Sequence, residues 1–161
     1  MAIRVSVETP LQDDVRVLVD GLNAHLLPLS PLEFQFKMTV EQMAGPDTSV
    51  FVARDENGKA VGCGALKMHG DGIAEVKRMF TLPEVRGKRV GSVLVDAIVD
   101  LARARSVTRL VLETGTGPGF AGAWRLYENS GFTRCGVVLD YPESEYSAFL
   151  KSVSLRRTDR I

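Results

Sequence analysis

A short basic segment near the middle of the chain combines residue types that bind anions. It follows Pro83 and leads into an amphipathic stretch, 91–104, so its main-chain N–H groups are expected at the positive end of a helix. Its glycines let an anion approach the main chain closely, and its basic side chains can reach phosphate oxygens. We therefore predict a phosphate site formed by Arg86, Gly87, Lys88, Arg89, Val90, Gly91 and Ser92.

Two other interpretations of this segment stay open on the residues alone. A single glycine-containing basic turn is weak evidence, and it is equally typical of a solvated surface turn. A P-loop is the competing phosphate chemistry, but no Gly-Lys-Ser/Thr follows the segment and no strand carries a suitably placed magnesium-binding acidic residue. We set the P-loop aside.

Apolar periodicity predicts the elements that hold this segment. Alternation predicts a strand that ends near Pro83, and helical spacing predicts the helix that follows. An Asn57-Gly58 pair between two β-branched runs is typical of an antiparallel hairpin. In chain order we expect strands at 3–7, 49–54, 60–68, 73–81, 109–113, 133–138 and 147–155, and helices at 11–27, 34–43, 91–104 and 120–129.

The order of these elements is that of a mixed α+β fold. One parallel pair of strands, 73–81 and 109–113, is expected to flank the helix at 91–104. A length of 161 residues suffices for one compact domain, 1–161, and is too short for two ordinary ones. We therefore expect a single domain.

Charge and cysteine content narrow the classes of partner. Twenty basic residues balance twenty acidic ones, so no global field exists to attract nucleic acid or an anionic membrane. Cys63 and Cys135 lie in apolar contexts without metal-ligand spacing and are expected as reduced thiols, with no metal. No stretch approaches the roughly 20 apolar residues of a membrane span. We expect a cytoplasmic protein without nucleic-acid or membrane partners, with a homodimer as the default assembly.

Three stretches together resemble the GNAT superfamily of N-acetyltransferases. The first, 75–91, resembles motif A, Arg/Gln-x-x-Gly-x-Gly/Ala, with its preceding strand; Leu112-Glu113-Thr114-Gly115 resembles the next strand; 123–132 resembles the Leu-Tyr-x-x-x-Gly-Phe signature. The resemblance covers about residues 49–138 and implies the acyl-CoA acyltransferase fold, a mixed, mostly antiparallel sheet with helices on both faces. Arg89 departs from the motif, because it stands at the position of the middle glycine.

The resemblance also implies a cosubstrate, acetyl-CoA, whose pyrophosphate would occupy the basic segment without a metal. In this fold the strands 73–81 and 109–113 splay apart, which leaves main-chain groups unpaired near Met79, Phe80 and Thr81. These groups are expected to bind the pantetheine arm and the acetyl oxygen. The side chains of Met79 and Phe80 are expected in the core.

Two residues are expected to act as acid and base. Tyr127 stands where many GNAT enzymes carry the tyrosine that protonates the leaving thiolate, and a phenol has an unperturbed pKa of about 10, above that of a thiol. Glu75 lies where the superfamily's histone acetyltransferases carry a general-base glutamate. Each has a structural alternative: Tyr127 as a packing residue, and Glu75 in an ion pair with Lys77 or Arg109. His25 and His69 are interpreted as surface residues.

The resulting hypothesis is an acetyl-CoA-dependent N-acetyltransferase. It would transfer the acetyl group to a primary amine of a small molecule or peptide by direct attack in a ternary complex. Glu143 and Glu145 would suit a cationic amine, although a solvated acidic loop is the simpler interpretation of them. An acyl-CoA-binding sensor or scaffold without turnover is the alternative, and a nucleic-acid binder is disfavoured by the charge balance and the lack of interleaved aromatic residues.

Overall fold

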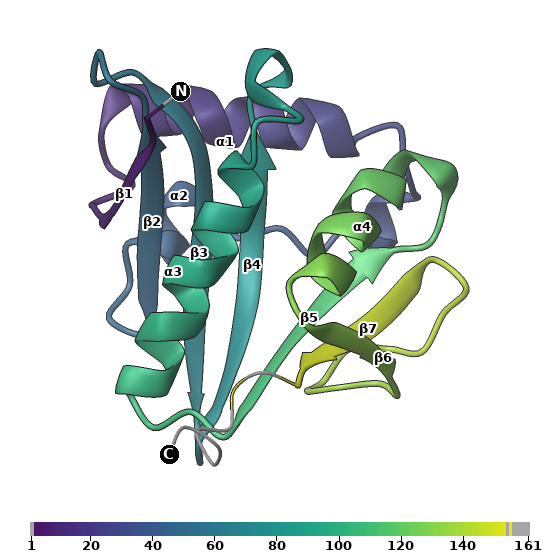
Figure 1. Cartoon of the computed structure of the whole chain (residues 1–161). Coiled ribbons are helices and arrows are strands. Elements are labelled where there is room, and N and C mark those ends of the chain that lie inside the picture. Colours follow the sequence, from purple (N-terminus) through teal and green to yellow (C-terminus); the bar gives the residue numbers. More distant parts are fainter. Residues whose placement is uncertain (1, 154, 156–161) are drawn as a thin grey trace.

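A seven-stranded sheet forms the centre of the computed structural model, which describes residues 2–153 and 155. The strand order is β1-β2-β3-β4-β5-β7-β6, and every neighbouring pair is antiparallel except β4 and β5 (Figure 1). The expected mixed, mostly antiparallel sheet is therefore confirmed. The strands are β1 Arg4–Val7, β2 Thr48–Arg54, β3 Ala60–Gly70, β4 Ile73–Thr81, β5 Arg109–Gly115, β6 Phe132–Cys135 and β7 Ser147–Ser152.

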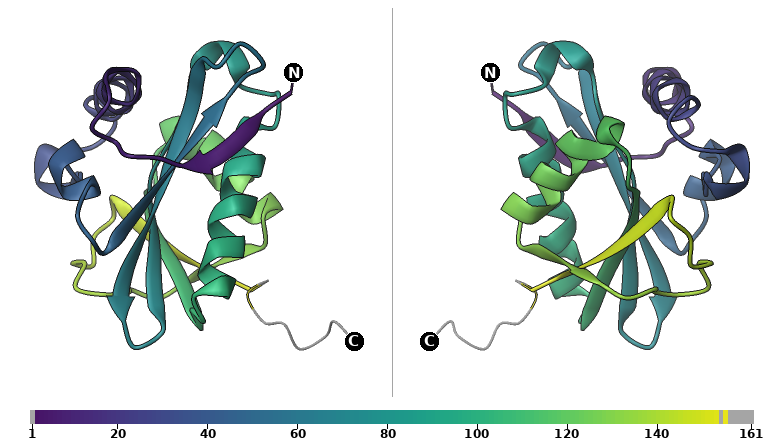
Figure 2. Two further views of the ribbon diagram at one scale, coloured as in Figure 1. Left: turned by 90° about the vertical axis from the view of Figure 1, so that its left-hand side faces the viewer. Right: turned by 90° about the vertical axis from the view of Figure 1, so that its right-hand side faces the viewer.

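Helices cover both faces of the sheet (Figure 2). One face carries α1, Asp13–Leu26, and α2, Val40–Met43, and the other carries α3, Val90–Ala104, and α4, Ala121–Asn129. The first turn of α1 contains Asp13 and Asp14, which favour the positive end of the helix dipole. The observed order of strands and α-helices is the one that the hydrophobic pattern predicts.

The two faces of the sheet carry separate apolar clusters. Under α3, the helix residues Leu94 and Ile98 pack on sheet residues such as Leu66 and Val76. Under α1, a second cluster is formed by Val15, Leu18, Val19, Leu22, Met38, Val40, Met43, Val50, Val52, Ala60, Cys63 and Phe80. Burial of apolar side chains on both faces stabilises the sheet. The sheet therefore holds the residues along its strand edges in place.

The segment between α1 and β2 differs from the prediction. Instead of one helix over 34–43, it contains a 3-10 turn, Leu32–Phe34, an extended stretch, and the single helical turn of α2. The Gln35 amide explains part of this path, because its Nε2 group donates to the carbonyl oxygens of Leu26, Leu27 and Ser30 at 3.2, 3.1 and 2.6 Å. The last two strands are also shorter than predicted.

β4 and β5 pair over only three positions. Ile73, Ala74 and Glu75 lie opposite Arg109, Leu110 and Val111, and the strands then diverge (Figure 1). Beyond this point β4 continues beside β3, as far as Thr81, and β5 continues beside β7. The facing edges of both strands are consequently open, as the resemblance implies.

No helix in the described part of the chain is long and apolar enough to cross a membrane. Among residues 2–153 and 155, no group of three or more His, Cys, Asp and Glu is placed to hold a metal ion. Cys63 and Cys135 are both free thiols, and burial raises the pKa of Cys63 to about 12, which keeps that thiol protonated.

Candidate active site

The basic segment forms a concave run of main-chain donors before α3. Gly87 and Arg89 both adopt positive φ, 83° and 67°, and Arg89 is the N-cap of the helix. Alternation of backbone conformation of this kind turns successive N–H groups toward one side, which makes an anion site. Within the described residues, no main-chain acceptor is bonded to the N–H groups of Gly87, Arg89, Val90, Gly91 and Ser92.

Not every group of this segment is free to bind an anion. The Lys88 N–H donates to the carbonyl oxygen of Val85 at 3.1 Å. The Arg86 side chain folds back on β4, where its Nη2 donates to the Thr81 oxygen at 3.1 Å and its guanidinium lies 5.6 Å from the Phe80 ring centroid. The side chains of Lys88 and Arg89 are on exposed residues.

The two glycines of the phosphate segment serve different purposes. A Cβ atom at Gly87 would meet nothing within 4 Å, so the space above it is open to a ligand. A Cβ atom at Gly91 would lie 3.1 Å from Cδ2 of Leu126, on α4. Gly91 therefore lets α3 and α4 approach closely, in addition to offering its N–H.

Main-chain groups of β4 lie beside the open edge. The Leu82 N–H donates to Val61 on β3 at 2.9 Å, and because successive residues of a strand alternate, the groups of Thr81 point to the opposite side. The Met79 side chain packs on the α3 cluster and that of Phe80 belongs to the α1 cluster. Phe80 is buried in the core, as expected from the sequence, whereas Met79 is only partly buried and also lines the cavity described below.

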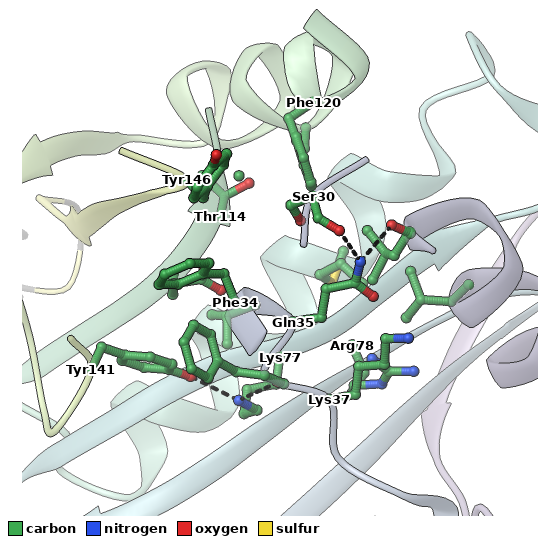
Figure 3. A pocket seen from close by; sticks show the side chains of 18 of the residues that line it. Ser30, Phe34, Gln35, Lys37, Lys77, Arg78, Thr114, Phe120, Tyr141 and Tyr146 are labelled. Atoms are coloured by element: carbon green, nitrogen blue, oxygen red, sulfur yellow. Dashed lines mark hydrogen bonds between the residues drawn. The ribbon is translucent and has the colours of Figure 1, made fainter. Parts of the chain in front are cut away.

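A cavity fills the space where β4 and β5 diverge, and it contains about 810 Å³ of empty space with its open mouth included. Its walls come from β4, β5, the end of α1, the segment 30–37, α4 and the loop before β7 (Figure 3). Its aromatic lining consists of Phe34, Phe36, Phe120, Tyr127, Tyr141 and Tyr146, and its charged lining of Lys37, Glu75, Lys77, Arg78 and Glu113.

Glu75 lines this cavity with both carboxylate oxygens engaged. Oε1 contacts His69 Nε2 at 2.9 Å, while Oε2 accepts from the Tyr141 hydroxyl and from Lys77 Nζ, the latter at 3.5 Å. Lys77 Nζ also donates to the Tyr141 hydroxyl at 2.8 Å. The expected ion pair with Lys77 is present, and Arg109 is not among the partners.

His69 and Tyr141 were not predicted as part of a site. His69 lies near the end of β3, next to β4, and is an exposed residue, as expected from the sequence, although 23% side-chain exposure leaves its ring in contact with Glu75. Tyr141 lies in the loop before β7 and stacks edge-on against Phe36 with ring centroids 5.0 Å apart. Burial and the nearby Glu75 raise the pKa of Tyr141, so its hydroxyl stays protonated and acts as a donor.

Glu113 is a second carboxyl group in the cavity, and it was missed from the sequence. It lies on β5 and accepts a hydrogen bond from Ser147 Oγ at 2.8 Å. Burial raises its pKa, against the lowering effect of that hydrogen bond. The available signal was a charged residue within the apolar strand Val111-Leu112-Glu113, a position where an isolated carboxyl is costly unless it is used.

Tyr127 is both a packing residue of the core and a residue of the cavity wall. Its ring is buried on α4, 8% exposed, and lies 5.9 Å from the ring centroid of Phe132. It also lines the cavity, and its hydroxyl makes no hydrogen bond within the described residues. Burial and the charge of Glu113 raise its pKa above the ordinary value.

A sheet split between two parallel strands, with a helix N-terminus and a cavity at the split, defines the class of acyl-CoA acyltransferases. The chain belongs to the acetyltransferase (GNAT) family, whose model matches residues 20–132. It is therefore an N-acetyltransferase by family, and members of this family use acetyl-CoA as the acetyl donor.

Individual relatives agree with this assignment. The chain is 37% identical over 150 residues to the IAA acetyltransferase of Azospirillum brasilense, which covers 92% of this chain and 96% of that protein. A provisionally assigned acyl-CoA N-acyltransferase from Klebsiella pneumoniae has a TM-score of 0.77 at 25% identity, over 93% of this chain and 96% of its own. The PaiA N-acetyltransferase of Thermoplasma acidophilum, solved with coenzyme A, shares the fold with a TM-score of 0.72 at 14% identity, over 94% and 99%.

Proposed function

We propose that this chain transfers the acetyl group of acetyl-CoA to the primary amine of a small molecule, by direct attack in a ternary complex. The observation that carries the proposal is the split between β4 and β5. Immediately beyond the last paired residue, Glu75, the split brings together an open strand edge, a cavity, two carboxyl groups and the Tyr127 hydroxyl. A reduced, acetyl-CoA-containing cytoplasm suits this chemistry.

The donors that precede α3 would hold the pyrophosphate. Five N–H groups that have no main-chain acceptor among the described residues, and open space above Gly87, fit a phosphate oxygen that approaches the backbone. Lys88 and Arg89 add charge from the rim, and Arg86 stays with Thr81 and Phe80. The main chain of Met79, Phe80 and Thr81, along the part of β4 that β5 does not pair, would bind the pantetheine arm and the thioester oxygen.

For the base, the contacts favour Glu113 over Glu75. Three donors occupy both oxygens of Glu75, so the ammonium of an acceptor would have to displace one of them. Glu113 has a single donor among the described residues, Ser147, and its raised pKa suits it to accept a proton near neutral pH. Glu75 then acts as a positioning residue that holds Tyr141 and Lys77 in the wall of the cavity.

The reaction follows from these positions. Glu113 removes a proton from the ammonium, and the free amine nitrogen bonds to the thioester carbon. The nitrogen then loses its second proton to solvent, and the carbon–sulfur bond breaks with its electron pair on sulfur. Tyr127 donates a hydrogen bond to the departing thiolate. Because burial raises the Tyr127 pKa, complete proton transfer to a thiolate of lower pKa is uphill, so the hydrogen bond, with the final proton from solvent, is the supported role.

Release of free thiol tests this function. The purified protein is incubated with acetyl-CoA and a panel of amino acids, polyamines and aminoglycosides, and thiol is followed together with the acetylated product. The proposal requires thiol release that depends on one of these amines and matches the product formed. Binding of acetyl-CoA in calorimetry without thiol release on any amine would instead support a sensor or scaffold.

A further inference from the structure

A β-bulge in β4 places two consecutive cationic side chains on the cavity side of the sheet. The β3–β4 register shifts between Cys63 and Ala65, and Arg78 adopts a positive φ of 58° at this point. Lys77 reaches Tyr141, and Arg78 reaches Asn23 on α1, so both lie on the face that α1 covers. In a regular strand these neighbours would point to opposite faces.

Arg78 is buried without an anionic partner among the described residues. The residue is 7% exposed, and its guanidinium donates from Nη2 to the neutral amide of Asn23. Its Nε is enclosed and has no hydrogen-bond partner. A buried guanidinium is normally matched by a carboxylate, because the loss of hydration is otherwise uncompensated. Arg78 also lines the cavity, so a ligand there can supply the missing charge (Figure 3).

The charges that line the cavity leave a positive excess. Three cations, Lys37, Lys77 and Arg78, face two carboxyl groups, Glu75 and Glu113. Lys77 is paired with Glu75, and Lys37 is half-buried and makes no ion pair with a described residue. Lys37 and Arg78 would therefore repel a purely cationic acceptor, whereas an acceptor that also carries a carboxylate would offset this repulsion.

The remaining lining is aromatic and apolar. Phe34 and Tyr146 lie with ring centroids 5.1 Å apart, Phe36 stands edge-on to Tyr141, and Leu22 and Leu26 of α1 complete this part of the wall. Surfaces of this kind bind the body of an aromatic or large aliphatic side chain.

We infer that the acceptor is an amino acid with an aromatic or large apolar side chain, whose carboxylate pairs with Arg78 while its amine faces Glu113. This inference rests on the proposed function, because it assigns the substrate class of the same site. The carboxylate restores charge balance at Arg78, and the aromatic wall takes the side chain.

The test compares acceptors that differ only in the carboxylate. Values of kcat/KM are measured for phenylalanine, its methyl ester and phenethylamine, at one concentration of acetyl-CoA. A charge-assisted pair with a buried guanidinium is worth roughly 10- to 100-fold, so phenylalanine should exceed both analogues by that factor. Equal or better turnover of the ester and the amine would overturn the inference while leaving acetyl transfer itself established.

A variant pair locates the effect at Arg78. Arg78→Met should lower kcat/KM for phenylalanine to the level of phenethylamine measured with the same variant, so that the preference for the acid is lost. Arg16→Met removes an exposed arginine that pairs with Glu41 on the surface, and it should change neither value. An unchanged preference for the acid in Arg78→Met overturns the assignment. If that variant does not fold, the ester and amine comparison in the wild type still decides. No turnover with any amine of the wider panel would instead count against the proposed function.

Discussion

Ser147 Oγ on β7 donates to Glu113 Oε2 on β5 across a distance of 2.8 Å, and the two residues face the cavity side of neighbouring strands. This bond stabilises the charged carboxylate, whereas burial destabilises it and is the larger effect. The balance keeps the pKa of Glu113 above the ordinary value. The rate should therefore fall at low pH as Glu113 becomes protonated. The pH of this fall, the acid limb of the rate profile, reports the pKa of Glu113 that Ser147 and burial together set.

Ser147→Ala should shift that limb to higher pH. Without its donor, the Glu113 carboxylate is less favourable, so its pKa rises further and activity is lost earlier as the pH falls. The measurement is kcat/KM against pH for wild type and variant, with a thermal melt to exclude unfolding. An acid limb that stays in place, or moves to lower pH, would show that Glu113 is not the group whose protonation lowers the rate.

Glu113→Gln should lower turnover on the order of 100-fold or more, because an amide cannot accept the proton of the ammonium. The affinity for acetyl-CoA, measured by calorimetry, should change little. Glu75→Gln is the matched control: it loosens Tyr141 and Lys77 and raises KM, but its acid limb should persist. Loss of the limb in Glu75→Gln and its retention in Glu113→Gln would return the role of base to Glu75.

Tyr127→Phe removes a hydroxyl that has no hydrogen-bond partner in the described residues and keeps the ring against Phe132. Stability should therefore be close to wild type. Turnover should fall about 10- to 100-fold if the hydroxyl stabilises the departing thiolate. A normal rate with an intact melt would leave Tyr127 as a packing residue only.

Two substitutions in the phosphate segment separate packing from binding. Arg89→Gly restores the residue type best suited to φ 67° and should leave acetyl-CoA affinity within about threefold of wild type, because the N–H donors remain. Gly91→Val should weaken binding strongly and also lower the melting temperature, since its side chain would meet Leu126. Strong loss of affinity in Arg89→Gly would show that this side chain, rather than the main chain, holds the phosphates.

An ion cluster outside the cavity, formed by Arg54 and Glu8, should make the free energy of unfolding depend on pH. Arg54 makes two hydrogen bonds to Glu8, at 2.8 and 3.1 Å, and holds the pKa of that carboxyl at about 2, below the ordinary 4.5. Because the folded value is the lower one, the stabilisation is complete above pH 4.5 and is lost as the pH falls toward 2. Glu8→Gln should cost about 1–2 kcal/mol in denaturant unfolding at neutral pH and almost nothing near the lower limit. An equal cost at both pH values would contradict this.

The sequence was most informative where local pattern decides structure. The alternation in β4 and the helical spacing in α3 placed the phosphate segment, and the motif order implied the split between β4 and β5. The segment 30–37 was beyond such patterns, because its path depends on hydrogen bonds from Gln35 to the end of α1 and on the aromatic wall across the cavity. These contacts join residues that are distant in the sequence, so they produce no periodic pattern from which the path could be predicted.

The chemistry of the cavity was only partly predictable for the same reason. Glu75 and Tyr127 carry motif positions, so the resemblance singled them out. The role of Glu113 could not be predicted without Ser147. That residue lies 34 residues further along the chain and contacts Glu113 only because their strands pair. Arg78 could not be predicted as a cavity residue without the bulge in β4, because regular alternation would have directed its side chain away from the cavity.

Release of thiol from acetyl-CoA is the most direct test of the central claim, that the cavity at the β4–β5 split catalyses acetyl transfer. Free thiol is followed in wild-type protein with acetyl-CoA, before and after addition of an amino acid acceptor. We expect no release before the acceptor is added and, afterwards, release equal to the amount of N-acetylated product. Tight binding of acetyl-CoA with no release on any amine would contradict it.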